Sequence, residues 1–148
     1  MEDYKWIKEM LIGQEIDDRL SVETVQEVYQ KLIEVAKKKG PYTKGYITYE
    51  EVMLLAELNR ENTYEREVVL CAMLGDISIH EHESNRPMLS AVVVHKPNPQ
   101  MGILAMPGDG FFNLAYDLGL YDGSRDTKDR MRFFSKEIKK VWEYWNRK

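Results

Sequence analysis

Four side chains in the middle of the sequence carry the chemistry of a small hydrolytic site. Glu81, Arg86 and Ser90 lie close together in the chain, and Asp109 follows in a later loop. If the chain folds back so that Glu81 faces Ser90 near an apolar layer, the carboxylate needs a partner, and Arg86 is the nearest cation by sequence. A hydrolase or nuclease uses such carboxylates as metal ligands or as a general base. The competing interpretation is a buried, hydrogen-bonded cluster that only fixes a turn.

Two histidines alternate with two glutamates in the sequence HEHE, residues 80–83. On a β-strand, His80 and His82 project from the same face, but zinc generally needs three or four ligands. His95 is about 13 Å from His80 along the predicted sheet and cannot easily complete the set. We therefore predict exposed histidines, no metal site and no other cofactor.

The single cysteine, Cys71, lies within a predicted apolar helix. One cysteine cannot form an internal disulfide, and a buried thiol is chemically inert. The sequence predicts a structural role for Cys71 and a reducing, cytoplasmic location.

Charge is spread unevenly along a chain whose formal net charge is −4. Residues 48–75 carry an excess of four acidic side chains, and residues 126–148 carry an excess of four basic ones. The predicted partner is a protein or a nucleic acid, and the acidic region opposes the approach of duplex phosphates. The predicted partner-binding residues are Arg60, Arg66, Arg86, Lys136, Lys139 and Lys140.

Length and composition favour one domain over residues 1–148. The chain is 43% hydrophobic, which is enough for a sizeable core. No apolar run approaches the ~20 residues of a membrane span, and the amino terminus lacks the apolar core of a signal peptide. The sequence leaves the oligomeric state open.

The elements that position these residues centre on a predicted β-hairpin over residues 75–96. Residues 76–80 alternate between polar and apolar side chains, and residues 88–94 form a valine-rich run. Residues 84–87 have the composition of a turn, and Pro87 has no N–H to donate. The predicted cross-strand pairs are Glu83 with Met88, Glu81 with Ser90, Ile79 with Val92 and Ile77 with Val94.

Helical patterns flank the hairpin on both sides. Thr48 and Glu51 have the spacing of a capping box, and Gly75 is the predicted end of the helix before the hairpin. The predicted helices cover residues 4–12, 21–38, 48–58, 63–74, 109–118 and 126–146, with brief strands at 45–47 and 103–105.

The order of elements over residues 21–96 resembles a winged helix-turn-helix domain. Residues 63–74 take the position of the recognition helix, and residues 83–87 take that of the wing tip. Within this stretch, YITYEEVMLLAEL is similar to the first helix of the helix-turn-helix in DNA alkyltransferase-like proteins. Those families carry a Pro-Cys-His-Arg nucleophile motif that this chain lacks, so alkyl transfer is not expected.

The sequence as a whole predicts an α+β fold. It consists of a winged-helix-like core over residues 21–96 and a helical elaboration over residues 97–148. The predicted function is a non-enzymatic binding or regulatory role. The alternative is a small hydrolase or nuclease built around Glu81, Arg86, Ser90 and Asp109.

Overall fold

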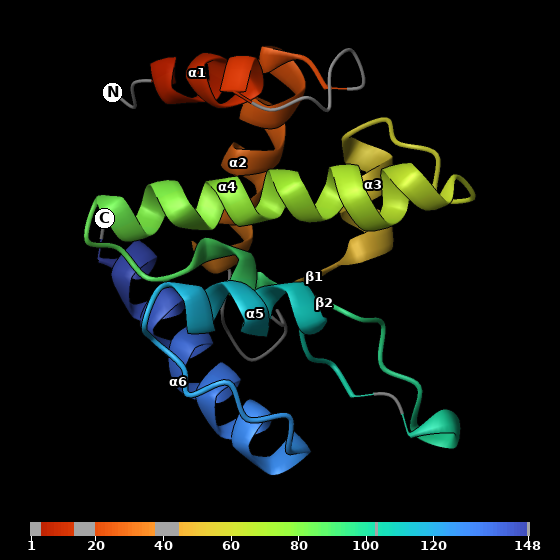
Figure 1. Ribbon diagram of the computed structural model, residues 1–148, viewed down its shortest axis with the longest axis vertical. Coiled ribbons are helices and arrows are strands. Elements are labelled where there is room, and N and C mark those ends of the chain that lie inside the picture. The colour runs from red at the N-terminus through yellow and green to blue at the C-terminus, as the bar shows by residue number, and fades with distance from the viewer. Residues whose placement is uncertain (1–3, 14–19, 38–44, 103, 148) are drawn as a thin grey trace.

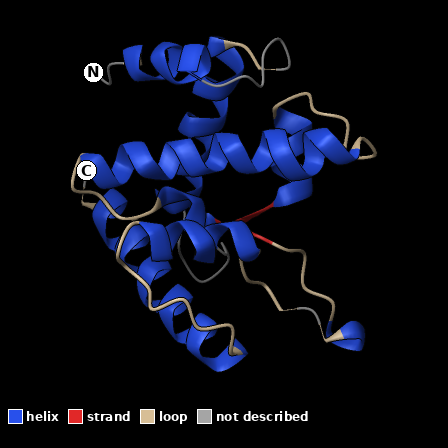
Figure 2. Cartoon of the chain, in the orientation of Figure 1, coloured by secondary structure: helices blue, strands red, loops and turns tan. Residues whose placement is uncertain are grey.

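Helices make up most of the chain, and one short pair of strands lies among them (Figures 1 and 2). The computed structural model describes residues 4–13, 20–37, 45–102 and 104–147. The α-helices are α1 (Lys5–Gly13), α2 (Val22–Lys37), α3 (Tyr49–Leu55), α4 (Leu70–Glu83), α5 (Asp109–Asp117) and α6 (Thr127–Asn146). The other elements are strands β1 (Ile47–Thr48) and β2 (Val93–Val94), the π-helical turn η2 (Glu65–Val69), and the 3₁₀ turns η3 (Leu89–Val92) and η4 (Pro99–Met101).

Side-chain caps begin several helices where the sequence predicts them. The Thr48 hydroxyl accepts from the N–H of Glu51 while the Glu51 carboxylate accepts from the N–H of Thr48, which completes the predicted capping box. The carboxylate of Asp126 accepts from the N–H groups of Lys128 and Asp129 at the start of α6. Both predicted helix starts are confirmed.

The predicted β-hairpin over residues 75–96 is wrong. Its first half belongs to α4, which continues past Gly75 to Glu83, and its second half forms η3 and the two residues of β2. The four predicted cross-strand pairs therefore do not form. In Figure 1, α4 is one straight helix that crosses in front of α2.

A helical period explains why residues 76–83 do not form a strand. The buried residues of α4 follow the i, i+3, i+4, i+7 spacing of one helix face and end at Glu81, whose buried charge hid this pattern. Gly75 does not end the helix, because a glycine without a positive φ can continue it. The face consists of Leu70, Met73, Leu74, Ile77, Ser78 and Glu81.

The strands β1 and β2 form a parallel pair. Ile47 lies opposite Val93, and Thr48 lies opposite Val94. Helices with this small sheet make the fold α+β, as predicted. The winged-helix-like core is not confirmed, because helix and 3₁₀ turn occupy the position expected for the wing. The predicted third strand is also wrong where it can be judged: Leu104 and Ala105 are not in a strand, and Ile103 lies outside the described residues.

The centre of the molecule is the segment from Met88 to Val94. Every residue in it is buried, and it contacts α2, α4 and α6. Buried hydrophobic side chains from all six α-helices join one core cluster around it, or lie against that cluster. The division into residues 21–96 and 97–148 stays a prediction. No helix in the described part of the chain combines the length and apolar character needed to cross a membrane.

Because Gly75 lies inside α4, a substitution at this position tests directly whether the helix continues through it. A Cβ at this position would meet its nearest neighbour, Leu114 Cδ2, at 3.9 Å, which is ordinary contact. We expect Gly75→Ala to stabilise the protein by about 0.5–1 kcal/mol in urea unfolding, because alanine loses less backbone entropy in a helix.

Gly45→Ala is the matched control for that substitution. Gly45 has a φ of +68°, and a Cβ there would lie 2.5 Å from Trp142 Nε1, so this variant should be destabilised. Destabilisation by Gly75→Ala would argue against a helix through residue 75.

Burial of Asp76 makes a second prediction. Its Oδ2 is buried and accepts no hydrogen bond from the described residues, and desolvation raises the pKa of the carboxyl to about 6. Ionised Asp76 therefore destabilises the folded state. This destabilisation is fully present above the folded pKa of about 6 and is absent below the unfolded pKa of about 3.9. We expect Asp76→Asn to be more stable than the native chain at pH 8, with the difference shrinking as the pH falls towards 4. Equal differences at both pH values would contradict this.

Candidate ligand pocket

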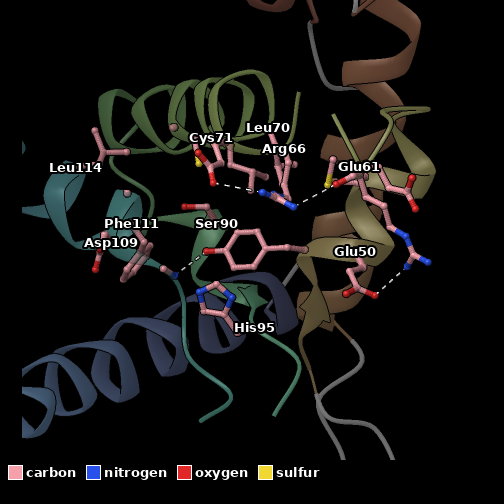
Figure 3. Close-up of a pocket in the computed structure, with 18 residues that line it drawn as sticks. Glu50, Glu61, Arg66, Leu70, Cys71, Ser90, His95, Asp109, Phe111 and Leu114 are labelled. Carbon is pink, nitrogen blue, oxygen red and sulfur yellow. Dashed lines mark hydrogen bonds and ion pairs between the residues drawn. The ribbon is translucent and has the colours of Figure 1, made fainter. Parts of the chain in front are cut away.

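A pocket of about 810 Å³ opens between α3, the η2–α4 helix and the start of α5. Figure 3 shows Glu50 and Glu61 on one side of it and Asp109, Phe111 and Leu114 on the other. Cys71 and Leu70 come from the helix along another wall, and His95 lies across from them. The pocket thus collects residues from three stretches of the sequence, 49–75, 90–95 and 108–114.

The parallel strands place two aromatic side chains side by side at one end of the sheet. Thr48 pairs with Val94 in a parallel arrangement. The residues that follow them, Tyr49 and His95, therefore lie at the same carboxyl end of the two strands. Their ring centroids are 4.9 Å apart with an interplanar angle of 47°. Both rings line the pocket. Carboxyl ends of parallel strands are common positions for binding groups in α/β proteins.

The turn before α5 closes this end of the pocket. The N–H of Gly108 donates to the Tyr49 hydroxyl oxygen at 2.8 Å. A Cβ on Gly108 would lie 3.1 Å from His95 Nε2, so a larger residue would press on the imidazole. Gly108 thus permits the close approach of the α5 turn to both rings.

Five apolar side chains supply the non-polar surface of the pocket. They come from α3, α4 and α5, and most are buried by the core behind them. Small-molecule sites usually combine such a surface with a few polar groups. The five residues are Met53, Leu70, Leu74, Phe111 and Leu114.

Charged side chains surround the apolar surface. Arg60 pairs with Glu50 at 3.2 Å, and Arg66 pairs with Glu67 at 3.4 Å. Glu61 has no cationic partner among the described residues, although its own N–H is held by the Asn59 side chain at 3.0 Å. The carboxylates are therefore in excess over the guanidinium groups along the pocket.

The protonation states in the pocket follow from burial and from these carboxylates. Burial, more than the nearby Cys71 and Asp109, raises the pKa of Tyr49 to about 12. Burial, and then the charge of Glu67, also raises the pKa of the Cys71 thiol. The hydrogen bond from Arg130, at 2.6 Å, lowers the pKa of Asp109. Near neutral pH, the pocket therefore holds a neutral phenol, a neutral thiol and an ionised carboxylate.

The predicted buried position of Cys71 is wrong. Cys71 is exposed to the pocket, and the pocket walls desolvate its thiol only in part. The core-facing stripe of the helix runs through Leu70 and Leu74 on either side of it. Gly110 lies near this sulfur: a Cβ on that glycine would be 3.9 Å from Sγ.

The four residues of the predicted hydrolytic site are divided between two places. Glu81 is fully buried away from the pocket, where its Oε2 accepts from Arg86 at 2.6 Å and from the Tyr29 hydroxyl at 2.9 Å. Ser90 and Asp109 both line the pocket. The Ser90 hydroxyl, however, is bonded to Ser78 at 2.6 Å. Glu81 and Arg86 thus form the buried cluster of the competing interpretation.

The histidines of HEHE do not share a face, because a two-residue step on a helix turns the side chains away from each other. His80 stacks on Trp6, with 3.9 Å between the ring centroids. Within the described ranges, no group of three or more histidine, cysteine, aspartate or glutamate side chains is arranged to hold a metal ion.

Most of the predicted partner-binding cations already have carboxylate partners. Arg60, Arg66 and Arg86 pair with glutamates, and Lys140 lies 3.8 Å from Glu137. Lys136 and Lys139 are exposed on α6. A nucleic-acid phosphate would have to compete with the carboxylates at four of the six positions.

The pocket residues missed by sequence reasoning are Tyr49, Glu61 and His95. Tyr49 directly follows the cap of α3, and His95 directly follows the valine run. Only the parallel pairing of those two segments shows that their side chains meet. The predicted antiparallel hairpin paired the valine run with residues 77–83 instead, so this contact was not expected.

Comparisons with protein-family models, curated proteins and solved structures give no match to this chain. The resemblance to winged helix-turn-helix domains therefore stays a prediction.

The buried Glu81–Arg86 pair predicts a large effect on stability. Arg86→Met leaves a fully buried carboxylate without its cation, and we expect a loss of about 3–5 kcal/mol in urea unfolding. Arg60→Met removes an exposed pair and should cost less than about 1 kcal/mol. Equal losses for the two variants would show that Arg86 does not anchor this part of the fold.

Proposed function

We propose that this chain is a non-enzymatic binding protein that takes a small amphiphilic cation in the pocket between α3, α4 and α5. The observation that carries this proposal is the combination of five apolar side chains with an acidic rim in one pocket of about 810 Å³. That volume lies within the range of about 300–1,000 Å³ found for small-molecule sites. An apolar body of the ligand would contact Leu70, Leu74 and Phe111.

The charges of the lining favour a positive ligand. Four carboxylates and two guanidinium groups line the pocket, a formal charge of −2 with His95 neutral. Three of these carboxylates already have an arginine partner, which leaves Glu61 as the natural contact for an ammonium group. An excess of one sign of charge in a hollow with apolar walls concentrates ions of the other sign.

The reactive groups of the pocket favour binding over catalysis. A nucleophilic cysteine needs a lowered pKa, whereas burial and Glu67 raise that of Cys71. A general acid or base works best with a pKa near the ambient pH, and Tyr49 is far from it at about 12. The pairing of Arg60 and Arg66 with glutamates likewise favours a small cation over a nucleic-acid partner.

Octylamine is a suitable probe, because it joins an ammonium group to an apolar chain. We expect it to bind the full chain more tightly than octanol, which has the same carbon chain without the charge, in an NMR titration. Glu61→Gln should weaken octylamine binding about two- to fivefold, the range for one exposed ion pair, and should leave octanol binding unchanged.

Glu83→Gln provides the control, since Glu83 is an exposed glutamate at the far end of α4 and does not line the pocket. This variant should bind both probes like the native chain. Octanol and octylamine binding with equal affinity would refute a cation site.

A further inference from the structure

We infer that Tyr49 and His95 form a subsite for a neutral carbonyl group, so that the ligand is an amine carrying an amide or ester carbonyl at the other end of an apolar chain. This inference rests on the proposed function, because it names the second polar end of the same ligand. The carbonyl subsite lies at the Gly108 turn, and Glu61 lies across the pocket from Asp109 (Figure 3).

The Tyr49 hydroxyl is a positioned donor without an acceptor in the described structure. Its oxygen accepts the N–H of Gly108 at 2.8 Å, which fixes the hydroxyl at the pocket wall. Its own proton is donated to none of the described residues. A phenol can donate one hydrogen bond while it accepts another. The structure therefore leaves one directed O–H for a ligand oxygen.

This donor keeps its proton under all ordinary conditions. Burial raises the pKa of Tyr49 to about 12, so the hydroxyl remains a neutral donor throughout the physiological range. Because deprotonation is suppressed, the group is suited to recognising an acceptor oxygen and not to exchanging a proton with it.

His95 offers a second polar group beside the first. Its ring lies 4.9 Å from that of Tyr49, and its side chain makes no hydrogen bond with the described residues. A neutral imidazole carries one N–H donor. No side chain caps the first turn of α5 next to it, and the first N–H groups of a helix have no partner within the helix. The Tyr49 hydroxyl and the His95 imidazole thus lie side by side at the start of α5.

The charge of the surroundings selects a neutral acceptor over a carboxylate. Asp109 is ionised, lies at the same turn, and contributes to the raised pKa of Tyr49. Asp109 is paired with Arg130, but the pocket as a whole holds more carboxylates than guanidinium groups, so a ligand carboxylate would add to this excess and an amide or ester carbonyl would not. The absence of a side chain on Gly108 lets the turn lie directly against the Tyr49 hydroxyl and the His95 ring, so all three groups border the same end of the pocket.

Three probes with one shared carbon chain test the subsite. Octylamine carries only the cation, 8-aminooctanamide adds a neutral carbonyl, and 8-aminooctanoate adds a carboxylate. In NMR titrations at neutral pH, we expect the amide to bind about three- to tenfold more tightly than octylamine, the range for one neutral hydrogen bond. The carboxylate should bind more weakly than the amide.

Tyr49→Phe should remove the advantage of the amide, so that the amide and octylamine bind this variant with similar affinity. Tyr116→Phe is the control, because Tyr116 is an exposed tyrosine that does not line this pocket. If Tyr49→Phe does not fold, His95→Leu gives a second test at an exposed position, and it should lower the ratio of amide to octylamine affinity.

The outcomes separate this inference from the proposed function. If octylamine does not bind the native chain, the proposed cation site is overturned, and the carbonyl subsite with it. If octylamine binds but the amide gains nothing, or Tyr49→Phe weakens both probes equally, the carbonyl subsite alone is overturned.

Discussion

The parallel pairing of Ile47–Thr48 with Val93–Val94 is the constraint on which the pocket depends. A pair of two-residue strands contributes few hydrogen bonds, and its position is set mainly by burial, since Val93 and Val94 are fully enclosed. Because the strands are parallel, the residues after them emerge at one edge, where the Gly108 turn meets both rings. Three segments separated by up to 59 residues thus meet at one end of the pocket.

The central segment is held in register by polar bonds inside an apolar core. The Ser78 hydroxyl accepts from the N–H of Ser90 at 3.0 Å, and the buried Glu137 carboxylate accepts from the N–H of Met88 at 3.0 Å. Buried polar groups are costly unless they are paired, so these contacts strongly favour one arrangement of the segment. They bind residues 88–94 to α4 and α6 and thereby fix where β2 meets β1.

Local signals predicted much of the helical structure correctly. The capping box at Thr48 rests on side-chain bonds to nearby backbone, which a sequence displays directly. The last helix begins at the predicted residue, where the structure adds a cap by Asp126. The prediction of a hairpin was wrong because five alternating residues fit a strand as well as a helix. The longer helical spacing of buried residues ends at Glu81, and a charged residue is not expected at a buried position. The pocket could not be predicted, since contacts such as Tyr49 with His95 depend on a long-range parallel pairing. Ser90 and Asp109 were found as lining residues, but their predicted partners Glu81 and Arg86 lie elsewhere.

The most direct test of this account is to map the backbone and ring signals of isotope-labelled full chain by NMR as 8-aminooctanamide is added. Binding at the ends of the parallel strands should shift the signals of Tyr49, His95, Gly108 and Glu61 together along one binding curve, while those of Lys136 and Lys139 on α6 stay in place. Shifts confined to α6, or spread evenly over the surface, would contradict a ligand site at the ends of the parallel strands.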